Sequence, residues 1–264
     1  MSESSSVLYE VQQSVATITL NRPESLNAMT NGLMKDLVDA LARVETDKSV
    51  RVVVITGSGR GFCAGADLAG HASAKPSDPE PDGKVDDHFN GAMRAIYNSS
   101  VPTVARVNGA AAGGGFGLAL ACDITVAAKN AFFVATFGPK LGIVPDLGTT
   151  WNLPRKAGRA RALGLAMLGD RITAEQAEAW GLIWKAVDDD QLDAEVELIT
   201  KKLARTSADA MTRIRSVTDA ALDNSFSDQL DLEMEHQAVL IPKNMTEGAT
   251  AFMEKREPEF SGRN

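Results

Sequence analysis

The sequence predicts an α/β fold followed by a helical C-terminal region. Near-continuous apolar runs rich in β-branched residues, which are typical of buried strands, recur at residues 50–56, 101–107 and 124–127. Segments with the periodicity of amphipathic helices separate these runs, and strands that alternate with helices indicate βαβ units. From about residue 155 onward the pattern becomes almost wholly helical.

Each element has its own local signal. Residues 15–20 alternate apolar and polar side chains, as in a half-buried strand, and end at a turn. Thr30 is placed to cap a helix that runs to about residue 44. Another helix is expected over residues 85–98, after a proline-containing loop at residues 72–84. The helices expected in the C-terminal part span residues 174–180, 192–206, 207–222, 227–240 and 246–256.

Composition and charge narrow the classes of protein. The 264 residues are 44% hydrophobic and 23% charged, as in a soluble globular protein with a sizeable core. No apolar run approaches the ~18 residues of a membrane span, and the first residues lack the basic and apolar regions of a signal peptide. The net charge of −8 argues against nucleic acid as a partner, because phosphate binding needs a basic face. We therefore expect a cytoplasmic protein with no membrane and no nucleic-acid partner.

Two glycine-rich segments carry the strongest functional signal. Residues 57–68 follow the strand-like run at 50–56, and residues 108–117 lead into an apolar, helix-like run. Small residues let a ligand approach the backbone closely and leave N–H groups free to point at it. Two such loops can direct two N–H donors at one oxygen, which is how enolates and tetrahedral oxyanions are stabilised. A dinucleotide-binding loop is disfavoured because the first segment lacks the G-x-G-x-x-G spacing, whereas two tight turns without a ligand stay open as an alternative.

Cysteine and histidine residues give no sign of a reactive or metal-binding site. Cys63 and Cys122 are interpreted as small buried residues, because no histidine is close enough in sequence to activate either thiol. His71, His88 and His236 show none of the spacings typical of metal ligands, so we expect no metal site.

Four segments together resemble the crotonase (enoyl-CoA hydratase/isomerase) superfamily. The resemblance implies a crotonase-like spiral of ββα units over residues 1–200 and a helical trimerisation region over residues 201–264. It also implies an acyl-CoA substrate, assembly into a homotrimer or hexamer, and no cofactor beyond the coenzyme A that enters with the substrate. The similarity extends from about residue 7 to residue 262 and is carried by residues 21–28, 61–68, 108–123 and 252–256.

By position, the resemblance assigns roles to individual residues. The backbone N–H groups of Ala66 and Gly114 would be the two oxyanion donors. The expected contacts with the substrate follow its length: Glu24, Ser25 and Leu26 along the pantetheine, Ala64, Asp67 and Leu68 near the nucleotide end, and Phe252 and Lys255 from the C-terminal helix.

The chain departs from the hydratases of this family at the catalytic acids. Those hydratases carry two glutamates that activate water and deliver a proton, whereas Gly117 and Gly138 occupy the two positions here. Asp146 falls where related dienoyl-CoA and ring-epoxide isomerases keep an aspartate, and residues 142–186 are especially similar to 1,2-epoxyphenylacetyl-CoA isomerases. On local sequence alone, an aspartate after a proline is more typical of a turn or a helix N-cap. We expect Asp146 to act as a base whose pKa is raised by an apolar acyl pocket, lined by Phe137, Leu141 and Trp151.

The leading hypothesis is an acyl-CoA isomerase that stabilises a thioester enolate. It would shift a double bond or rearrange a ring 1,2-epoxide of an aryl-acetyl-CoA. One alternative is an enoyl-CoA hydratase of weak or broad specificity. Another is a non-catalytic acyl-CoA-binding protein that kept the oxyanion loops and lost the acids. RNA binding, which is known within the superfamily, is disfavoured by the net charge of −8.

Overall fold

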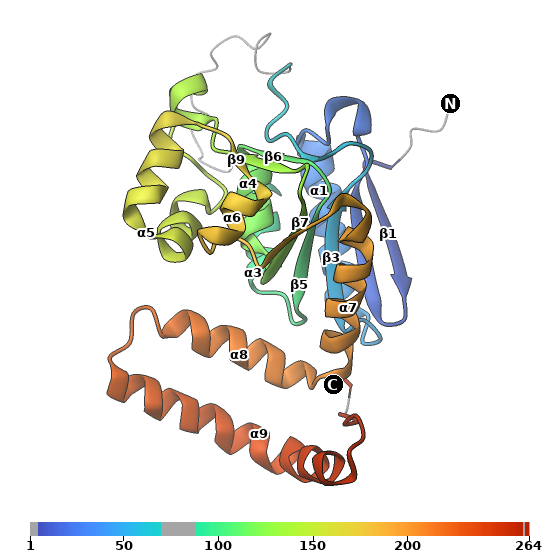
Figure 1. Ribbon diagram of the computed structural model, residues 1–264. Helices are drawn as coiled ribbons and strands as arrows, with labels where there is room; N and C mark the ends of the chain where they lie inside the picture. Colours follow the sequence, from blue (N-terminus) through green and yellow to red (C-terminus); the bar gives the residue numbers. More distant parts are fainter. Residues whose placement is uncertain (1–4, 70–87, 261, 264) are drawn as a thin grey trace, which may run out of the picture.

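Two β-sheets form the centre of the protein in the computed structural model, which describes residues 5–69, 88–260 and 262–263 (Figure 1). The successive pairs β3–β4, β5–β6 and β7–β8 each give one strand to either sheet, so the chain winds in the spiral that the resemblance implies. The larger sheet runs in the order β1 (Val7–Gln12), β2 (Val15–Leu20), β3 (Val52–Gly57), β5 (Thr103–Val107), β7 (Ile124–Ala128) and β10 (Lys185–Val187). The smaller sheet runs in the order β4 (Gly61–Cys63), β6 (Ala110–Ala112), β8 (Phe132–Val134) and β9 (Ile172–Thr173).

Helices cover both faces of the larger sheet. Helices α1, α3 and α4 bury their apolar residues in the main core on one face, and α7 packs against the other face. The α-helices of the described residues are α1 (Asn31–Thr46), α3 (His88–Tyr97), α4 (Gly114–Ala121), α5 (Thr149–Leu168), α6 (Ala174–Ala179), α7 (Leu192–Arg205), α8 (Ala208–Ala220) and α9 (Phe226–Glu254). Short helical turns form at η1 (Pro23–Ser25), η2 (Phe137–Leu141) and η3 (Asp189–Gln191).

Strand β3 shows why a continuous β-branched run is needed at this point of the chain. It pairs in parallel with β2 on one side and β5 on the other. Val53 and Ile55 point into the main core, whereas Val52 and Val54 belong to the apolar cluster under α7. Because both faces of the strand are covered, every position favours an apolar side chain.

Helix α1 begins where the sequence predicts. The Thr30 hydroxyl accepts a hydrogen bond from the Leu33 N–H at 3.1 Å and so satisfies one of the free donors of the first turn. Leu33, Leu37 and Leu41 are buried along one stripe of the helix, as the periodicity requires.

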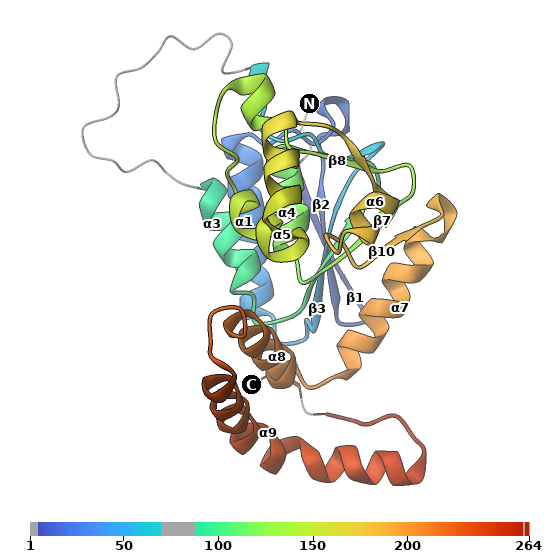
Figure 2. The same cartoon turned by 60° about the vertical axis from the view of Figure 1, so that its left-hand side comes forward.

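The C-terminal part corrects one expectation. The separate helices predicted over 227–240 and 246–256 are wrong, because residues 226–254 form the single helix α9, with Pro242 inside it. A proline removes one helical hydrogen bond and bends a helix without ending it, and α9 changes direction along its length (Figure 2). The part after residue 155 is almost wholly helical, as predicted, and its only strands among the described residues are the short β9 and β10. The loop expected at 72–84 lies outside the described residues.

Helices α8 and α9 extend away from the two sheets, whereas α7 packs on the larger sheet and spans the expected boundary between residues 200 and 201 (Figure 1). Within the part of the chain that the structure describes, no helix combines the length and the apolar character needed to cross a membrane.

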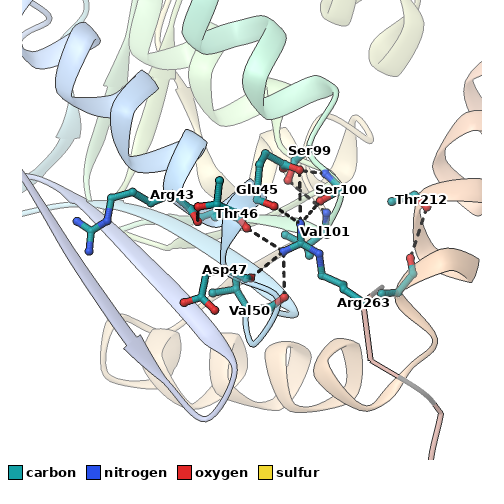
Figure 3. Close-up of polar contacts among 12 residues, drawn as sticks. Arg43, Glu45, Thr46, Asp47, Val50, Ser99, Ser100, Val101, Thr212 and Arg263 are labelled. Carbon is teal, nitrogen blue, oxygen red and sulfur yellow. Dashed lines mark hydrogen bonds and ion pairs between the residues drawn. The ribbon is translucent and has the colours of Figure 1, made fainter.

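The C-terminal end of the chain returns to the core through Arg263, whose side chain is only 5% exposed (Figure 3). Its guanidinium donates to the carbonyl oxygens of Val44 at 2.8 Å, Asp47 at 3.1 Å and Val50 at 3.3 Å, and to the Ser100 hydroxyl. Two of these acceptors belong to the C-terminal end of α1, where carbonyl groups lack helical partners and a positive charge is favourable.

Candidate active site

The two glycine-rich loops meet at the start of α4. Gly65 has a φ of +88°, and a Cβ atom built on it would lie 2.8 Å from the Ala112 carbonyl oxygen and 3.2 Å from the Gly114 nitrogen. Side chains do not tolerate such distances, so only glycine permits this approach of the two backbones. The sequence prediction that the two loops converge is therefore confirmed by the geometry.

Two backbone N–H groups at this meeting point have no protein acceptor among the described residues. The main chain of Met29 accepts from Asp67 at 2.9 Å and donates to the Gly65 carbonyl at 2.7 Å, which leaves the Ala66 N–H directed away from it. Gly114 is the first residue of α4, where N–H groups have no helical partner and the helix dipole is positive. Both residues line the same cleft, so the arrangement can hold a negatively charged oxygen between two donors.

The cleft has a volume of about 690 Å³ and is bounded by the two loops, the turn η2 and the loop before α5. Most of the residues expected at the site line it: Ala64, Ala66, Asp67, Leu68, Gly114, Phe137, Leu141 and Asp146. Its lining also includes residues that the sequence analysis did not expect at the site, among them Met29, Thr30, Phe89, Thr136, Ile143 and Leu147.

Asp146 faces this cleft from the loop between η2 and α5. Partial burial raises the pKa of its carboxyl group, and a hydrogen bond from its own backbone N–H opposes that change. The carboxylate does not cap α5, because the N-cap residue is Gly148 and no side chain caps that end. The helix-cap interpretation of Asp146 is therefore not supported, although its carbonyl oxygen accepts the hydrogen bond from the Thr149 N–H that closes the turn at residues 147–148.

The two glycines that the resemblance places at the glutamate positions of the hydratases have close main-chain neighbours. A Cβ atom built at Gly117 would lie 2.7 Å from the Leu147 carbonyl oxygen. At Gly138 the corresponding distance to the Ala166 carbonyl oxygen is 3.0 Å. In this conformation a side chain at position 117 would have to displace main chain, whereas at position 138 the Ala166 carbonyl would have to move by a few tenths of an ångström.

Three of the expected substrate contacts lie away from the cleft in a single chain. Trp151 lines a separate cavity of about 380 Å³, where its ring packs edge-on against Tyr97 at 5.7 Å, so its placement in the acyl pocket is corrected. The reason is that Asn152, its neighbour in the first turn of α5, is buried, which turns Trp151 outward. Phe252 is 82% exposed on α9, and Lys255 caps the end of that helix, so neither lines the cleft.

Residues 24–26 lie beside the oxyanion loop and not in the cleft itself. The Leu26 carbonyl accepts a hydrogen bond from the Ala64 N–H at 3.0 Å, and Glu24 lines a shallow polar pocket on the other side. The Ser25 hydroxyl donates to the Arg22 carbonyl at 3.1 Å. This segment therefore contacts the first glycine-rich loop outside the cleft and helps to hold it in place.

Polar side chains of the same segment hold that loop in place. Arg22 pairs with Asp67 at 3.0 Å, and the buried amide of Asn27 donates to the carbonyl oxygens of Gly61 at 2.9 Å and Phe62 at 3.2 Å. These bonds fix the loop that presents the Ala66 N–H. The role of Asn27 was missed at the sequence level, although it lies within a segment that carries the resemblance.

The cysteine thiols are inert, as the sequence predicts. Cys63 and Cys122 are buried, and burial raises the pKa of each thiol to about 12, so neither forms a thiolate near neutral pH. His236 contacts Arg213 at 3.1 Å, and the described residues contain no group of three or more potential metal ligands. His71 lies outside the described residues.

The spiral fold and the two convergent N–H donors define a class of enzymes that stabilise an oxyanion on a bound carbonyl compound. Residues 10–263 match the family Enoyl-CoA hydratase/isomerase. The chain is 42% identical to the 1,2-epoxyphenylacetyl-CoA isomerase of Escherichia coli (strain K12), over 97% of this chain and 98% of that protein. It is 40% identical to a probable enoyl-CoA hydratase of Rhodobacter capsulatus, with the same coverage.

A solved structure of an enoyl-CoA hydratase from Polaromonas sp. JS666 superposes with a TM-score of 0.90 at 33% identity, over 97% of this chain and 99% of that one. The chain therefore belongs to the enoyl-CoA hydratase/isomerase family, and its fold is that of the crotonase superfamily.

Proposed function

We propose that this protein is an acyl-CoA isomerase that works through a thioester enolate. The thioester oxygen of the substrate would accept hydrogen bonds from the N–H groups of Ala66 and Gly114, which line one cleft and have no acceptor in the described part of the chain. These donors, together with the N-terminal end of α4, stabilise the negative charge that develops on that oxygen. Removal of a proton from the carbon next to the carbonyl then becomes easier.

Asp146 would carry that proton. For a 3-enoyl-CoA, the carboxylate takes a proton from C2 while the electron pair moves into the enolate, and the resulting carboxylic acid returns the proton to C4. The double bond thereby moves to the 2-position, and no atom is gained or lost. With a ring 1,2-epoxide of an aryl-acetyl-CoA, the same polarised thioester would assist rearrangement of the epoxide.

The observation that carries the proposal is the position of Asp146 relative to the missing acids. Asp146 lies in the cleft of the two N–H donors, whereas Gly117 and Gly138 carry no acid and Gly117 leaves no space for one. Asp67 also lines the cleft, but it is paired with Arg22. Of these carboxylates, Asp146 is the one suited to exchange a proton with a substrate.

The named relatives support two different activities. The name of the Escherichia coli protein supports an isomerase, and that of the Rhodobacter capsulatus protein supports an enoyl-CoA hydratase. We favour the isomerase because hydration requires a group that activates water, and the two glutamate positions of the hydratases are occupied by glycines here. A non-catalytic acyl-CoA-binding protein would keep the two donors and lose turnover altogether.

The proposal also includes contacts between residues 24–26 and the pantetheine of the substrate, and it requires no further cofactor. We further propose that the protein is a cytoplasmic trimer or dimer of trimers with no nucleic-acid or membrane partner. The exposed apolar residues of α8 and α9 support assembly, because such side chains favour a partner surface. In an assembly, Phe252 and Lys255 of one copy would contact coenzyme A bound to another copy.

A product screen tests the activity. The purified protein is incubated with crotonyl-CoA, with 3-hexenoyl-CoA and with the ring 1,2-epoxide of phenylacetyl-CoA, and products are analysed by mass spectrometry and NMR. Hydration adds the mass of water, whereas isomerisation leaves the mass unchanged. We expect isomerisation of the second or third compound to be faster than hydration of the first. Faster hydration of crotonyl-CoA would overturn the proposal, and binding without any turnover would establish the non-catalytic alternative.

A further inference from the structure

We propose that Gly117 is a positioning residue, because it provides the space in which the loop carrying Asp146 rests against α4. The inference rests on the proposed function and adds a role for a residue that the comparison with hydratases treats only as a lost acid. In place of an acid, this position has a close contact between helix α4 and the loop that precedes α5.

The contact at Gly117 is steric. A Cβ atom there would lie 2.7 Å from the Leu147 carbonyl oxygen, 2.8 Å from the Thr149 hydroxyl oxygen and 3.2 Å from the Leu147 Cβ. Gly117 lies inside α4 and is not among the glycines with a positive φ, so its backbone conformation does not require glycine. Glycine is the least favourable residue after proline in a helix interior, so the close approach of the loop is the reason for its presence.

The same helix turn receives the loop at a second point. A Cβ atom at Gly114 would lie 2.7 Å from the Leu147 Cδ1, and the Leu147 side chain is buried. Residues 114 and 117 are three positions apart and so share one face of the helix. Gly114 also supplies one oxyanion donor, so one face of α4 holds both that donor and the loop next to Asp146.

The main chain transmits this placement to Asp146. Leu147 and Gly148 both have positive φ values, 49° and 73°, and the Asp146 carbonyl accepts a hydrogen bond from the Thr149 N–H at 2.9 Å. The structure gives the Asp146 carboxylate no ion pair with another described residue. Its position relative to the Gly114 N–H is therefore set by where the loop backbone lies.

One consequence concerns specificity. A side chain at position 117 and the loop in its present place exclude each other, because they require the same space. A carboxylate on α4 at this position is thus incompatible with the carboxylate of Asp146 in its present place. Gly117→Glu is expected to lose isomerase activity without gaining the hydratase activity of a two-glutamate site.

The direct test compares Gly117→Ala with Gly164→Ala. At Gly164, in α5, an added Cβ meets nothing within 4 Å and the φ is not positive, so this variant should keep wild-type turnover. We expect Gly117→Ala to fold, to bind butyryl-CoA with wild-type affinity, and to lose about 10- to 100-fold in kcat, since a 1 Å displacement of a catalytic group can cost ~10²-fold. The acidic limb of its pH–kcat profile should also move, because the surroundings of the Asp146 carboxylate change.

A kcat within about twofold of the wild type, with an unmoved acidic limb, overturns the inference. If Gly117→Ala does not fold, Gly148→Ala gives the test, because it strains the same loop from a left-handed position without touching α4. We expect the same fall in kcat with retained butyryl-CoA binding, and unchanged turnover again overturns the inference. Asp146→Asn distinguishes failure of the proposed function from failure of this inference. Full activity of Asp146→Asn would overturn the proposed function itself. Loss of activity in Asp146→Asn together with normal turnover of Gly117→Ala would overturn only the role of Gly117.

Discussion

Asp146 is positioned by main-chain contacts and not by partners of its carboxylate. Burial raises the pKa of this carboxyl group towards the working pH of an enzyme. A group whose pKa is close to the working pH can both accept a proton and give it back. A group held in this way can change its protonation state without breaking an ion pair. That property suits a residue that takes a proton from one carbon and delivers it to another.

Asp146→Asn should separate binding from turnover. The amide keeps the size of the side chain and removes the base, so affinity for a saturated acyl-CoA should persist while kcat falls by roughly 10²–10⁴-fold. Isothermal titration with butyryl-CoA and an isomerase assay on one preparation measure the two quantities. Near-normal turnover would exclude Asp146 from the mechanism and leave only the two N–H donors.

The pH dependence of the same variant gives a second readout. Because only the deprotonated carboxylate accepts a proton, kcat of the wild type should rise with pH through an inflection above the ordinary aspartate value of 3.8, and this limb should vanish in the variant. A raised pKa in the folded state means that the ionised carboxylate destabilises the fold above that pKa. The Asn variant should therefore be at least as stable as the wild type at pH 7, as thermal unfolding can check.

Single residues of the site were predictable from sequence to different degrees. Glycine patterns marked the two loops, and the resemblance to the family singled out Ala66 and Gly114 within them. Trp151 was misplaced because the direction of a side chain on a first helical turn depends on which neighbours are buried. The role of Leu147 depends on a loop conformation that only the contact with α4 fixes, so no local pattern indicates it.

Elements were predictable where the signal is local and long enough. Helix α1 combines an N-cap with a full apolar stripe, and β3 shows an unbroken β-branched run. The strands β4, β6 and β8 have three residues each, too few to show alternation, so the smaller sheet was not predictable strand by strand. The break predicted between residues 240 and 246 does not exist, because the turns on either side of Pro242 continue the helix past the proline.

Helix α9 carries an apolar stripe that nothing in a single chain covers. Large exposed side chains recur at roughly helical spacing along it: Phe226, Leu230, Met234, Ile241, Met245 and Phe252. A helix face of this kind is typical of a subunit interface. This stripe is the strongest support for assembly through the C-terminal region.

We expect Met234→Glu to dissociate the assembly, because it places a charge in the middle of the stripe, where Met234 is 65% exposed in the single chain. Light scattering at micromolar concentration should give a trimer or hexamer for the wild type and smaller species for the variant. Glu235→Gln, one residue away at an exposed position, is the matched control and should leave the mass unchanged. A monomeric wild-type protein would refute the proposed assembly.

At the scale of the whole molecule, arginines join the C-terminal region to the core. Arg263 donates to carbonyl groups at the end of α1, as described above, and Arg215 of α8 pairs with Asp123 at 2.5 Å and donates to the Val101 carbonyl at 2.9 Å. Both side chains are largely buried, at 5% and 15% exposure. The contacts meet the core near the turns that precede β3 and β5.

Arg263→Met should lower stability clearly. It removes a donor that the partly buried carbonyl groups of Val44, Asp47 and Val50 share, for which we expect a loss of about 2–4 kcal/mol. At roughly 2–4 °C per kcal/mol for a chain of this size, the change is easily measured as a fall in Tm. Arg256→Met is the control, because the ion pairs of Arg256 with Glu247 and Glu254 and its hydrogen bond to the Glu257 carbonyl are all exposed, and its Tm should change much less. Equal effects of the two substitutions would contradict a structural role for Arg263.

The Arg263 contacts also impose an order in time. Val44 and Arg263 are 219 residues apart, and at ~5–20 residues per second a ribosome needs roughly 10–40 s to add them. During that interval α1 and β3 can already pack, but the end of α1 lacks the donor that completes it. The contact can therefore form only after residue 263 has been added, and a chain that stops before Arg263 lacks the donor at the end of α1.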